Sequence, residues 1–473
     1  MPKKSIIHKL NKELFINVFM HINRDNLYYG CKNIFELLFQ IRSKKYTNYL
    51  SIIDSCEDPL IKNCHTEIIK TYLEDLNIRT ISTIQLGTII KKLLIPYNYT
   101  FYEMNTFNTK QKLLTNLKIK NKIIYCSSND NTLKIFNLDG VLLMTIIHNN
   151  EIWAYNIYEE TDKIIIVSGS VDKVIKITHI KLNLNNQYQP MKLINQNELK
   201  RHKSIIRVIH TMEQNGKILF ISGSRDSSIC IFDKYGFVIS QFSQHHDSIR
   251  CIQSIDGYLI TGSYDGTVRM YNCAYGFENN SYESRTQKII QSLGIIHEHD
   301  SRIYTINIYK GLNFIVIASA GLGNQVYISK IKYTIINQNM CIKKEFIKNK
   351  QHIIFHVMNA PLISWVYAFG KYILAISING EIVKYNRICE IKEANLQINS
   401  IIKCTILKNE MLYIGTISGL LIVSLKVLKI VNTLYEDISI VKLDCENDNL
   451  IVGYLNEHQE TTISILKYKT VFK

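Results

Sequence analysis

The sequence predicts a mainly β protein in which one short unit is repeated around a ring, preceded by a smaller helical region. Two observations predict this: a strand–turn–strand phrase recurs along the chain, and a histidine stands ahead of four of its copies. Of the 473 residues, 46% are hydrophobic, so a large core can be buried, and only 20% are charged, which argues against disorder. We expect helices in residues 5–45 and 46–96 and the repeats in residues 97–473.

The repeated phrase consists of small residues, an acidic or polar turn, and alternating apolar residues. Small residues end one strand, Asp or Asn with Gly tolerates the turn, and the apolar alternation forms the next strand. The four clearest copies are Cys126–Phe136, Ser168–Ile177, Ser222–Phe232 and Thr261–Tyr271. Including four weaker copies, the turn positions are Asp130, Asp172, Asp226, Asp265, Gly323, Asn379, Ser418 and Asn456.

The spacing of the turn positions indicates a β-propeller. Consecutive positions lie 42, 54, 39, 58, 56, 39 and 38 residues apart, and a propeller blade of this type takes about 40–45 residues. The longer intervals would hold loop insertions, such as Asn183–Asn197 and Ala274–Lys288. Eight copies predict eight blades, or seven if the copy at Asn456 is not a true repeat. Closure would need a strand near Tyr99–Glu103 that pairs into the last blade.

A histidine precedes four of the phrases and is followed four positions later by Ile. These histidines are His148, His202, His245 and His299. The pattern resembles the WD-repeat family over roughly Tyr97–Lys473, and the resemblance implies a protein-binding propeller in which each His shares hydrogen bonds with the turn Asp. Gly323 removes one such Asp. The family's Trp position holds Phe136, Thr178, Phe232 and Tyr271, which shortens the hydrogen-bond network.

The amino-terminal region carries an amphipathic stripe, since apolar residues recur every four positions from Leu10 to Ile22. The stretch from Leu10 to Lys32 is similar to an F-box, the helical element that binds a Skp-type adaptor of a cullin ubiquitin ligase. Asn11 replaces the usual Pro and the later Trp is absent, so a generic amphipathic helix is the alternative. Residues 46–96 would be a helical spacer. The resemblance implies an adaptor-binding set of Leu10, Leu14, Val18, Phe19, Ile22, Leu27 and Cys31.

Two positions can be compared from blade to blade as candidate binding slots. Slot 1, the fifth residue after the repeat His, holds Trp153, Arg207, Arg250 and Tyr304. Slot 2, the residue before the turn position, holds Asn129, Val171, Arg225, Tyr264 and Leu322. Equivalent slots in a ring point to one region, so we expect the three arginines to meet beside Trp153, Tyr264 and Tyr304. The alternative is that each Arg is solvated or paired with an acid of a neighbouring loop.

The three arginines predict a phosphate site, because a guanidinium donates two parallel hydrogen bonds to one phosphate. The aromatic residues would suit an apolar or prolyl neighbour of that phosphate. Five strings are similar to the pocket of the cell-division-control class of F-box/WD-repeat receptors, which read phosphothreonine followed by proline. The resemblance implies a substrate receptor of an SCF-type ubiquitin ligase; the alternative is an interaction scaffold without ligase association. The strings are His202–Arg207, Ser222–Asp226, His245–Cys251, Tyr264-Asp265 and His148–Trp153.

Bulk properties restrict the remaining functions. The net charge of +16 favours an acidic partner, but it is spread along the chain, which does not favour nucleic acid. The eleven Cys lack framework spacing, which suggests reduced thiols inside the cell, in the cytoplasm or nucleus. Met1–Lys12 lacks a secretory signal and no run of about 18 apolar residues occurs, so no membrane association is expected. We expect no metal site, since His299 in the His297–Asp300 string already fills the repeat position. We expect no enzyme and no cofactor, since the sequence carries no nucleophile elbow, Walker loop, kinase motif set or dinucleotide fingerprint.

Overall fold

The computed structural model describes residues 98–181, 191–214, 216–273, 290–336, 339–343, 345, 347, 351–357, 361–388 and 390–471. The chain divides into two compact units, Met1–Phe101 with Tyr468–Lys473, and Tyr102–Lys467. The second unit contains the repeats and is described below. The expected helical regions and the adaptor-binding set from Leu10 to Cys31 lie outside the described residues.

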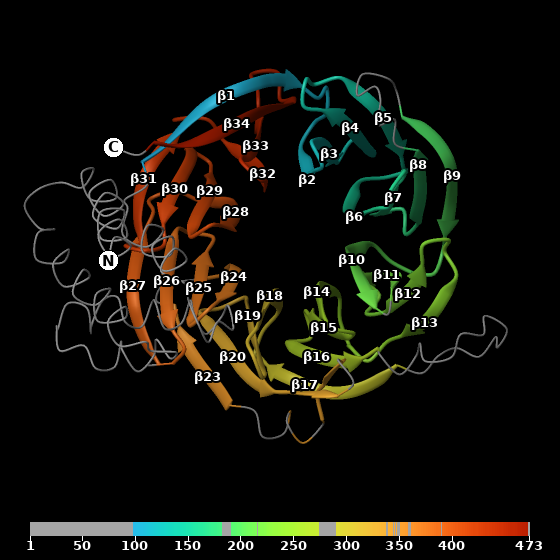
Figure 1. Cartoon of the computed structure of the whole chain (residues 1–473), viewed down its shortest axis with the longest axis vertical. Coiled ribbons are helices and arrows are strands. Elements are labelled where there is room, and N and C mark those ends of the chain that lie inside the picture. Colours follow the sequence, from blue (N-terminus) through green and yellow to red (C-terminus); the bar gives the residue numbers. More distant parts are fainter. Residues whose placement is uncertain are drawn as a thin grey trace, which may run out of the picture. The chain divides into compact units, whose positions relative to one another are not determined.

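Eight four-stranded antiparallel sheets form the blades of a ring, with the first strand of each blade at the centre (Figure 1). Blade 1 comprises β2 (Leu114–Lys120), β3 (Ile123–Ser128), β4 (Thr132–Asn137) and β5 (Leu142–Ile147). Blade 2 comprises β6 (Ile152–Glu159), β7 (Lys163–Ser170), β8 (Ile175–Lys181) and β9 (Lys192–Leu199). Blade 3 comprises β10 (Ile206–Gln214), β11 (Lys217–Ser224), β12 (Ile229–Asp233) and β13 (Val238–Phe242), and blade 4 comprises β14 (Ile249–Ile255), β15 (Tyr258–Ser263), β16 (Thr267–Asn272) and β17 (Gln291–Glu298).

Blades 5 to 8 continue the ring in chain order. Blade 5 comprises β18 (Ile303–Lys310), β19 (Phe314–Gly321), β20 (Gln325–Lys332) and β23 (Gln351–His356). Blade 6 comprises β24 (Ile363–Phe369), β25 (Tyr372–Ser377), β26 (Glu381–Asn386) and β27 (Ile391–Gln397). Blade 7 comprises β28 (Ile402–Lys408), β29 (Met411–Thr416), β30 (Gly419–Ser424) and β31 (Lys429–Leu434), and blade 8 comprises β32 (Ile440–Glu446), β33 (Asn449–Leu455), β34 (Thr461–Val471) and β1 (Asn98–Asn108).

The predicted turn positions all lie between the second and third strands of a blade, from Asp130 after β3 to Asn456 after β33. The prediction of eight blades is therefore confirmed, and the alternative of seven is wrong. The end of the ring that carries these turns is called the turn face below. One expectation was too broad: the second part of the supposed loop Asn183–Asn197 forms β9. This strand is almost wholly exposed, so it lacks the apolar alternation that marks half-buried strands.

The ring closes as the sequence led us to expect, because β1 is the outermost strand of blade 8 beside β34. Thr109 N donates a hydrogen bond to Thr461 O at 3.0 Å. At the centre of the ring, Ile119 N of blade 1 donates to Asp444 Oδ2 of blade 8 at 2.7 Å. Strand pairing at the rim and a side-chain bond near the axis thus join the first and last repeats.

The core lies between adjacent blades, and glycine in the repeated phrase permits their close approach. A Cβ at Gly223 would lie 2.5 Å from Cγ2 of Ile249, the first residue of the next blade's inner strand. A Cβ at Gly169 would lie 2.4 Å from Cγ2 of Ile206 in the same way. Both isoleucines are fully buried. The small residues of the phrase therefore serve blade-to-blade packing as well as the turn.

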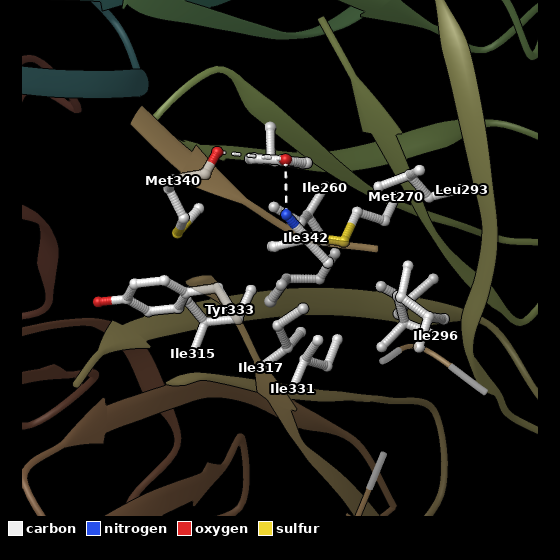
Figure 2. Packing of buried hydrophobic residues seen from close by; sticks show 14 of the residues in the cluster. Ile260, Met270, Leu293, Ile296, Ile315, Ile317, Ile331, Tyr333, Met340 and Ile342 are labelled. Atoms are coloured by element: carbon white, nitrogen blue, oxygen red, sulfur yellow. Dashed lines mark hydrogen bonds between the residues drawn. The ribbon is translucent and has the colours of Figure 1, made fainter. Parts of the chain in front are cut away.

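Blade 5 carries an additional hairpin between its third and fourth strands, formed by β21 (Thr334–Ile336) and β22 (Asn339–Cys341). Met340 of this hairpin and Ile342, which follows it, pack into the apolar cluster shared by blades 4 and 5 (Figure 2). The Tyr258 hydroxyl donates to Met340 O at 3.3 Å and accepts a hydrogen bond from Ile342 N at 2.8 Å. The insertion is thus fixed to two blades.

The residues that the structure describes hold neither a membrane-spanning helix nor a disulfide bond. Within the described part of the chain, no helix has both the length and the apolar character needed to cross a lipid bilayer. The cysteines of the described residues are free thiols, and burial raises the pKa of several, including Cys126.

Candidate anion-binding site on the turn face

A buried histidine beneath each turn fixes the residue of slot 2. In blade 4, His245 Nδ1 donates to Asp265 Oδ2 at 2.9 Å, and its Nε2 accepts from Thr261 Oγ1 at 2.8 Å. Burial raises the pKa of the Asp265 carboxyl, but hydrogen bonds from His245 and neighbouring groups more than offset this and hold the pKa below its usual range. Blades 2 and 3 hold His148 and His202 in similar hydrogen-bond networks. The turns are therefore rigid supports for the residues that precede the aspartates.

A β-bulge directs the residue of slot 1. In blade 3 the pairing of β10 with β11 skips Arg207, because Ile206 pairs with Ser224 and Val208 pairs with Gly223. The extra residue of a bulge is left out of the ladder, and its side chain is turned in a new direction. The same irregularity recurs at this position in every blade, at Thr115, Trp153, Arg207, Arg250, Tyr304, Ser364, Lys403 and Val441.

Four guanidinium groups gather on the turn face of blades 3 to 5. A cavity of about 260 Å³ is lined by Arg207, Arg225 and Arg302 together with Tyr264, Asp247 and Ser248. Arg250 does not line this cavity, but it lies close enough to Arg207 to affect its ionisation. Burial lowers the pKa of the Arg207 guanidinium below its ordinary value, and the positive charges of Arg250 and Arg225 lower it further. The structure thus brings the three predicted arginines into one electrostatic environment.

The aromatic residues singled out in the sequence lie against these cations. The Arg207 guanidinium carbon is 4.1 Å from the centre of the Trp153 ring, and that of Arg250 is 5.7 Å from the Tyr304 ring. The Tyr264 and Tyr304 rings are 5.1 Å apart and tilted by 42°. Trp153 Nε1 donates to Glu151 Oε2 at 2.9 Å, which fixes the indole beneath Arg207. Cation–π contact of this kind favours a fixed guanidinium orientation.

The four guanidiniums have no ion-pair partner in the described part of the chain. Among the described residues, no carboxylate forms an ion pair within 4.0 Å of Arg207, Arg225, Arg250 or Arg302. Asp247 lines the cavity, and its Oδ1 accepts a hydrogen bond from Ser248 N at 2.6 Å. Two residues that line the cavity each carry a buried group without a hydrogen-bond partner in the described structure, Arg207 Nε and Ser248 Oγ. Buried polar groups are nearly always hydrogen-bonded, so these two are suited to an incoming acceptor.

Sequence comparison of two slots missed several residues of this site. Arg302 and Ser248 each occupy the position just before the first residue of an inner strand, Ile303 or Ile249. This third slot accepts a hydrogen bond from the slot 2 amide of its own blade, as in Tyr264 N to Ser248 O at 3.0 Å. In the sequence this slot is the residue just ahead of each repeated Ile, three positions after the repeat His. Only the observed pairing shows that it reaches the same surface.

Slot 2 of blades 5 to 7 and slot 3 of blades 6 and 7 hold aliphatic residues. Leu322 and Ile417 in slot 2 are 48% and 44% exposed, and Ile401 in slot 3 is 50% exposed. Backbone hydrogen bonds join these slots: Leu322 N donates to Arg302 O at 2.8 Å, and Ile417 N donates to Ile401 O at 3.1 Å. We call Leu322, Leu362, Ile378, Ile401 and Ile417 the aliphatic rim.

The histidine pair that resembles metal ligands is engaged in hydrogen bonds. Ser319 Oγ lies 2.5 Å from His297 Nδ1 and 2.7 Å from His299 Nε2. In the residues covered by the structure, no group of three or more His, Cys, Asp or Glu side chains is arranged to hold a metal ion.

Comparison with known proteins agrees with this architecture. Residues 236–272 match the family model described as WD domain, G-beta repeat. The WD repeat-containing protein pop2 of Schizosaccharomyces pombe is 25% identical over 189 residues, 35% of this chain and 26% of its own length. The nuclear distribution protein PAC1 of Zygosaccharomyces rouxii is 24% identical over 159 residues, 31% of this chain and 34% of its own length. The matches thus span about a quarter to a third of these relatives.

The fold also occurs in a solved structure, that of the computationally designed Ika8 protein. The two chains superpose with a TM-score of 0.55 at 14% sequence identity, covering 76% of this chain and 98% of the designed one. Likeness at this identity concerns the fold alone. WD40 propellers are typically non-catalytic, in agreement with the expectation that the protein is not an enzyme. The chain is an eight-bladed β-propeller, and one of its repeats, in residues 236–272, matches the WD domain, G-beta repeat model.

Proposed function

We propose that this protein recognises phosphorylated proteins on the turn face of its propeller and acts as a substrate receptor of an SCF-type ubiquitin ligase. The observation that carries the proposal is the cluster of four guanidiniums without a carboxylate partner. A buried donor without an acceptor costs about 1–3 kcal/mol, and Arg207 Nε and Ser248 Oγ are two such groups, in residues that line the cavity. A bound anion would supply the acceptors that these groups lack.

Phosphate suits this cluster better than a carboxylate does. A phosphorylated side chain carries a charge of about −1.5 to −2 and three strong acceptor oxygens, so it can engage several arginines at once. Tyr264 and Tyr304 form an aromatic surface next to the cations, which suits a prolyl or other apolar residue beside the phosphate. The aliphatic rim begins at Leu322, whose backbone is bonded to Arg302, and offers contacts to further apolar residues of the same target segment.

The ligase part of the proposal rests on the resemblance of the stretch Leu10 to Lys32 to an F-box. In this role the protein holds a target near the ligase and contributes proximity, while other subunits perform the chemistry. The proposal places the protein inside the cell, in the cytoplasm or nucleus, where kinases and ubiquitin ligases act. Its partners would be a Skp-type adaptor, a cullin and phosphorylated proteins.

Binding of a phosphothreonine-proline peptide to the full chain tests the first half of the proposal. Fluorescence anisotropy should show binding of the phosphorylated peptide and much weaker binding of its unphosphorylated form. Arg207→Ala, Arg225→Ala and Arg250→Ala should each weaken binding at least tenfold, because removing one partner of a desolvated charge pair costs about 2–5 kcal/mol. Arg201→Ala, which removes an exposed arginine outside the cavity, is the matched control. Equal affinity for the two peptides would refute phosphate recognition.

Co-purification with a Skp-type adaptor tests the second half. Leu14→Asp or Phe19→Asp should abolish the association if the amino-terminal region is an F-box, while phosphopeptide affinity serves as the control measurement. If the phosphopeptide binds and the adaptor does not, the remaining function is that of an interaction scaffold without ligase association.

A further inference from the structure

Blade 5 differs from blade 4 beneath its turn. In blade 4 the buried His245 is bonded to the carboxylate of Asp265 at 2.9 Å. The corresponding turn position of blade 5 is Gly323, so the buried His299 lacks this carboxylate. His299 Nε2 is bonded to Ser319 Oγ at 2.7 Å, and His299 forms no ion pair with any residue that the structure describes. Blade 5 therefore keeps a buried imidazole without the usual counter-charge.

A chain of hydrogen bonds leads from His299 through blade 5 to its outer strand. Ser319 Oγ contacts both His299 and His297, as described above. His297 Nε2 lies 2.9 Å from Ser329 Oγ, which lies 3.1 Å from His352 Nδ1. Both serines are fully buried and His297 is 1% exposed, whereas His352 lies at the exposed end on β23. Three imidazoles and two hydroxyls thus form one continuous network, which we call the histidine chain.

The buried His299 ring is poorly placed to carry a positive charge. Its Nε2 is bonded to the neutral hydroxyl of Ser319, and the carboxylate that the turn of blade 4 supplies is replaced by Gly323. Burial lowers the pKa of His299 to about 4, and His352 contributes to this shift. Tyr327, whose ring centre is 3.8 Å from that of His299, supplies no negative charge, because burial raises its pKa. The nearby acids Glu298 and Asp300 are exposed.

His299 also anchors the loop that leads into the anion-binding site. Its backbone N donates to Gly266 O at 2.8 Å, which attaches the loop to the turn of blade 4. Arg302 O accepts from Leu322 N at 2.8 Å, which attaches it to the turn of blade 5. Arg302 lines the cavity, and Tyr304 lies against Tyr264. A change at His299 is therefore transmitted over three to five residues to two groups of the site.

We propose that the histidine chain makes blade 5 an acid-sensitive element of the turn face, whose local opening on protonation displaces Arg302 and Tyr304. The direction follows from proton linkage. The pKa of His299 is lower in the closed state than its ordinary value of 6.5, so the closed state is favoured above pH 6.5 and loses this advantage as the pH falls towards 4. For one such proton, the opening equilibrium increases about tenfold between pH 7.5 and 5.5.

Hydrogen exchange on the full chain at pH 7.5 and 5.5 tests this proposal. After correction for the intrinsic pH dependence of exchange, the amides of residues 299–304 should open about tenfold more often at pH 5.5. Residues 245–250, the equivalent loop of blade 4, should change much less, since Asp265 partly offsets the effect of burial on His245. An equal increase in the two loops would overturn the proposal.

Two variants separate the histidine chain from other acid effects. His299→Gln removes the buried proton acceptor and should abolish the excess acid response of residues 299–304. His246→Gln, which replaces an exposed histidine outside the chain, should retain it. Retention of the response in His299→Gln would also overturn the proposal. Should His299→Gln fail to fold, the comparison of the two loops in the unmodified protein remains decisive.

Discussion

Two parts of the turn face have the same backbone frame and opposite chemistry. Blades 3 to 5 place Arg207, Arg225 and Arg302 around a cavity, whereas blades 5 to 7 place Leu322, Ile401 and others in equivalent slots. The bulge, the turn and the hydrogen bond between slots 2 and 3 recur in both parts. The repeat therefore fixes where side chains emerge, while the residues at a few slots decide the chemistry that each sector presents.

The largest effect is expected when the cationic sector is disabled. The double variant Arg207→Ala with Arg250→Ala should weaken phosphopeptide binding at least a hundredfold, equivalent to about 3 kcal/mol, because both guanidiniums contribute to one anion site. Isothermal titration calorimetry measures the loss, with Arg201→Ala as the control. A loss no larger than that of the control would mean that the two sectors do not differ in the way proposed.

Disabling the aliphatic rim should have a smaller and more selective effect. Ile401→Asp with Ile417→Asp should reduce affinity about tenfold for a phosphopeptide with flanking Leu residues, because burying one aliphatic side chain contributes about 1.5–3 kcal/mol. The same peptide with Ala in place of Leu should be little affected. Ile430→Asp, at a 43% exposed position on the outer strand β31, is the matched control. Equal losses for the two peptides would contradict a role of the rim in binding.

The stacking of Trp153 on Arg207 should contribute less than either sector. Trp153→Leu keeps an apolar side chain but removes the ring face and the bond to Glu151, so affinity should fall about three- to tenfold. Surface plasmon resonance with the phosphothreonine-proline peptide provides the measurement. If Trp153→Leu binds as tightly as the unmodified protein, the position of Arg207 does not depend on the indole.

A change in ionic strength should produce the smallest change in phosphopeptide affinity. Raising NaCl from 50 to 200 mM should weaken phosphopeptide binding by roughly two- to fivefold, since exposed charges are screened over about 10 Å or less. The Ile401→Asp and Ile417→Asp double variant should keep the same salt dependence, whereas Arg225→Ala should reduce it. A salt dependence that persists unchanged in Arg225→Ala would assign the attraction to charges elsewhere on this basic protein.

Local sequence patterns predicted much of the fold and part of the site. The turn positions from Asp130 to Asn456 identified all eight blades, because turn residues and apolar alternation are local signals. The outer strand β9 escaped prediction, since an exposed polar strand has no such alternation. Slots 1 and 2 named the arginines, but not Arg302, whose slot has no distinctive residue type in other blades.

The amino-acid sequence was enough to predict the repeat and the residue types at each slot, and it favoured eight blades over seven, since these depend on spacing and turn chemistry within one blade. Which side chains meet depends on the tertiary structure. The bulge that redirects Arg207, the stacking of Trp153 against it and the chain from His299 to His352 depend on contacts across strands and blades. Such contacts arise from ring closure and packing, which no local pattern encodes.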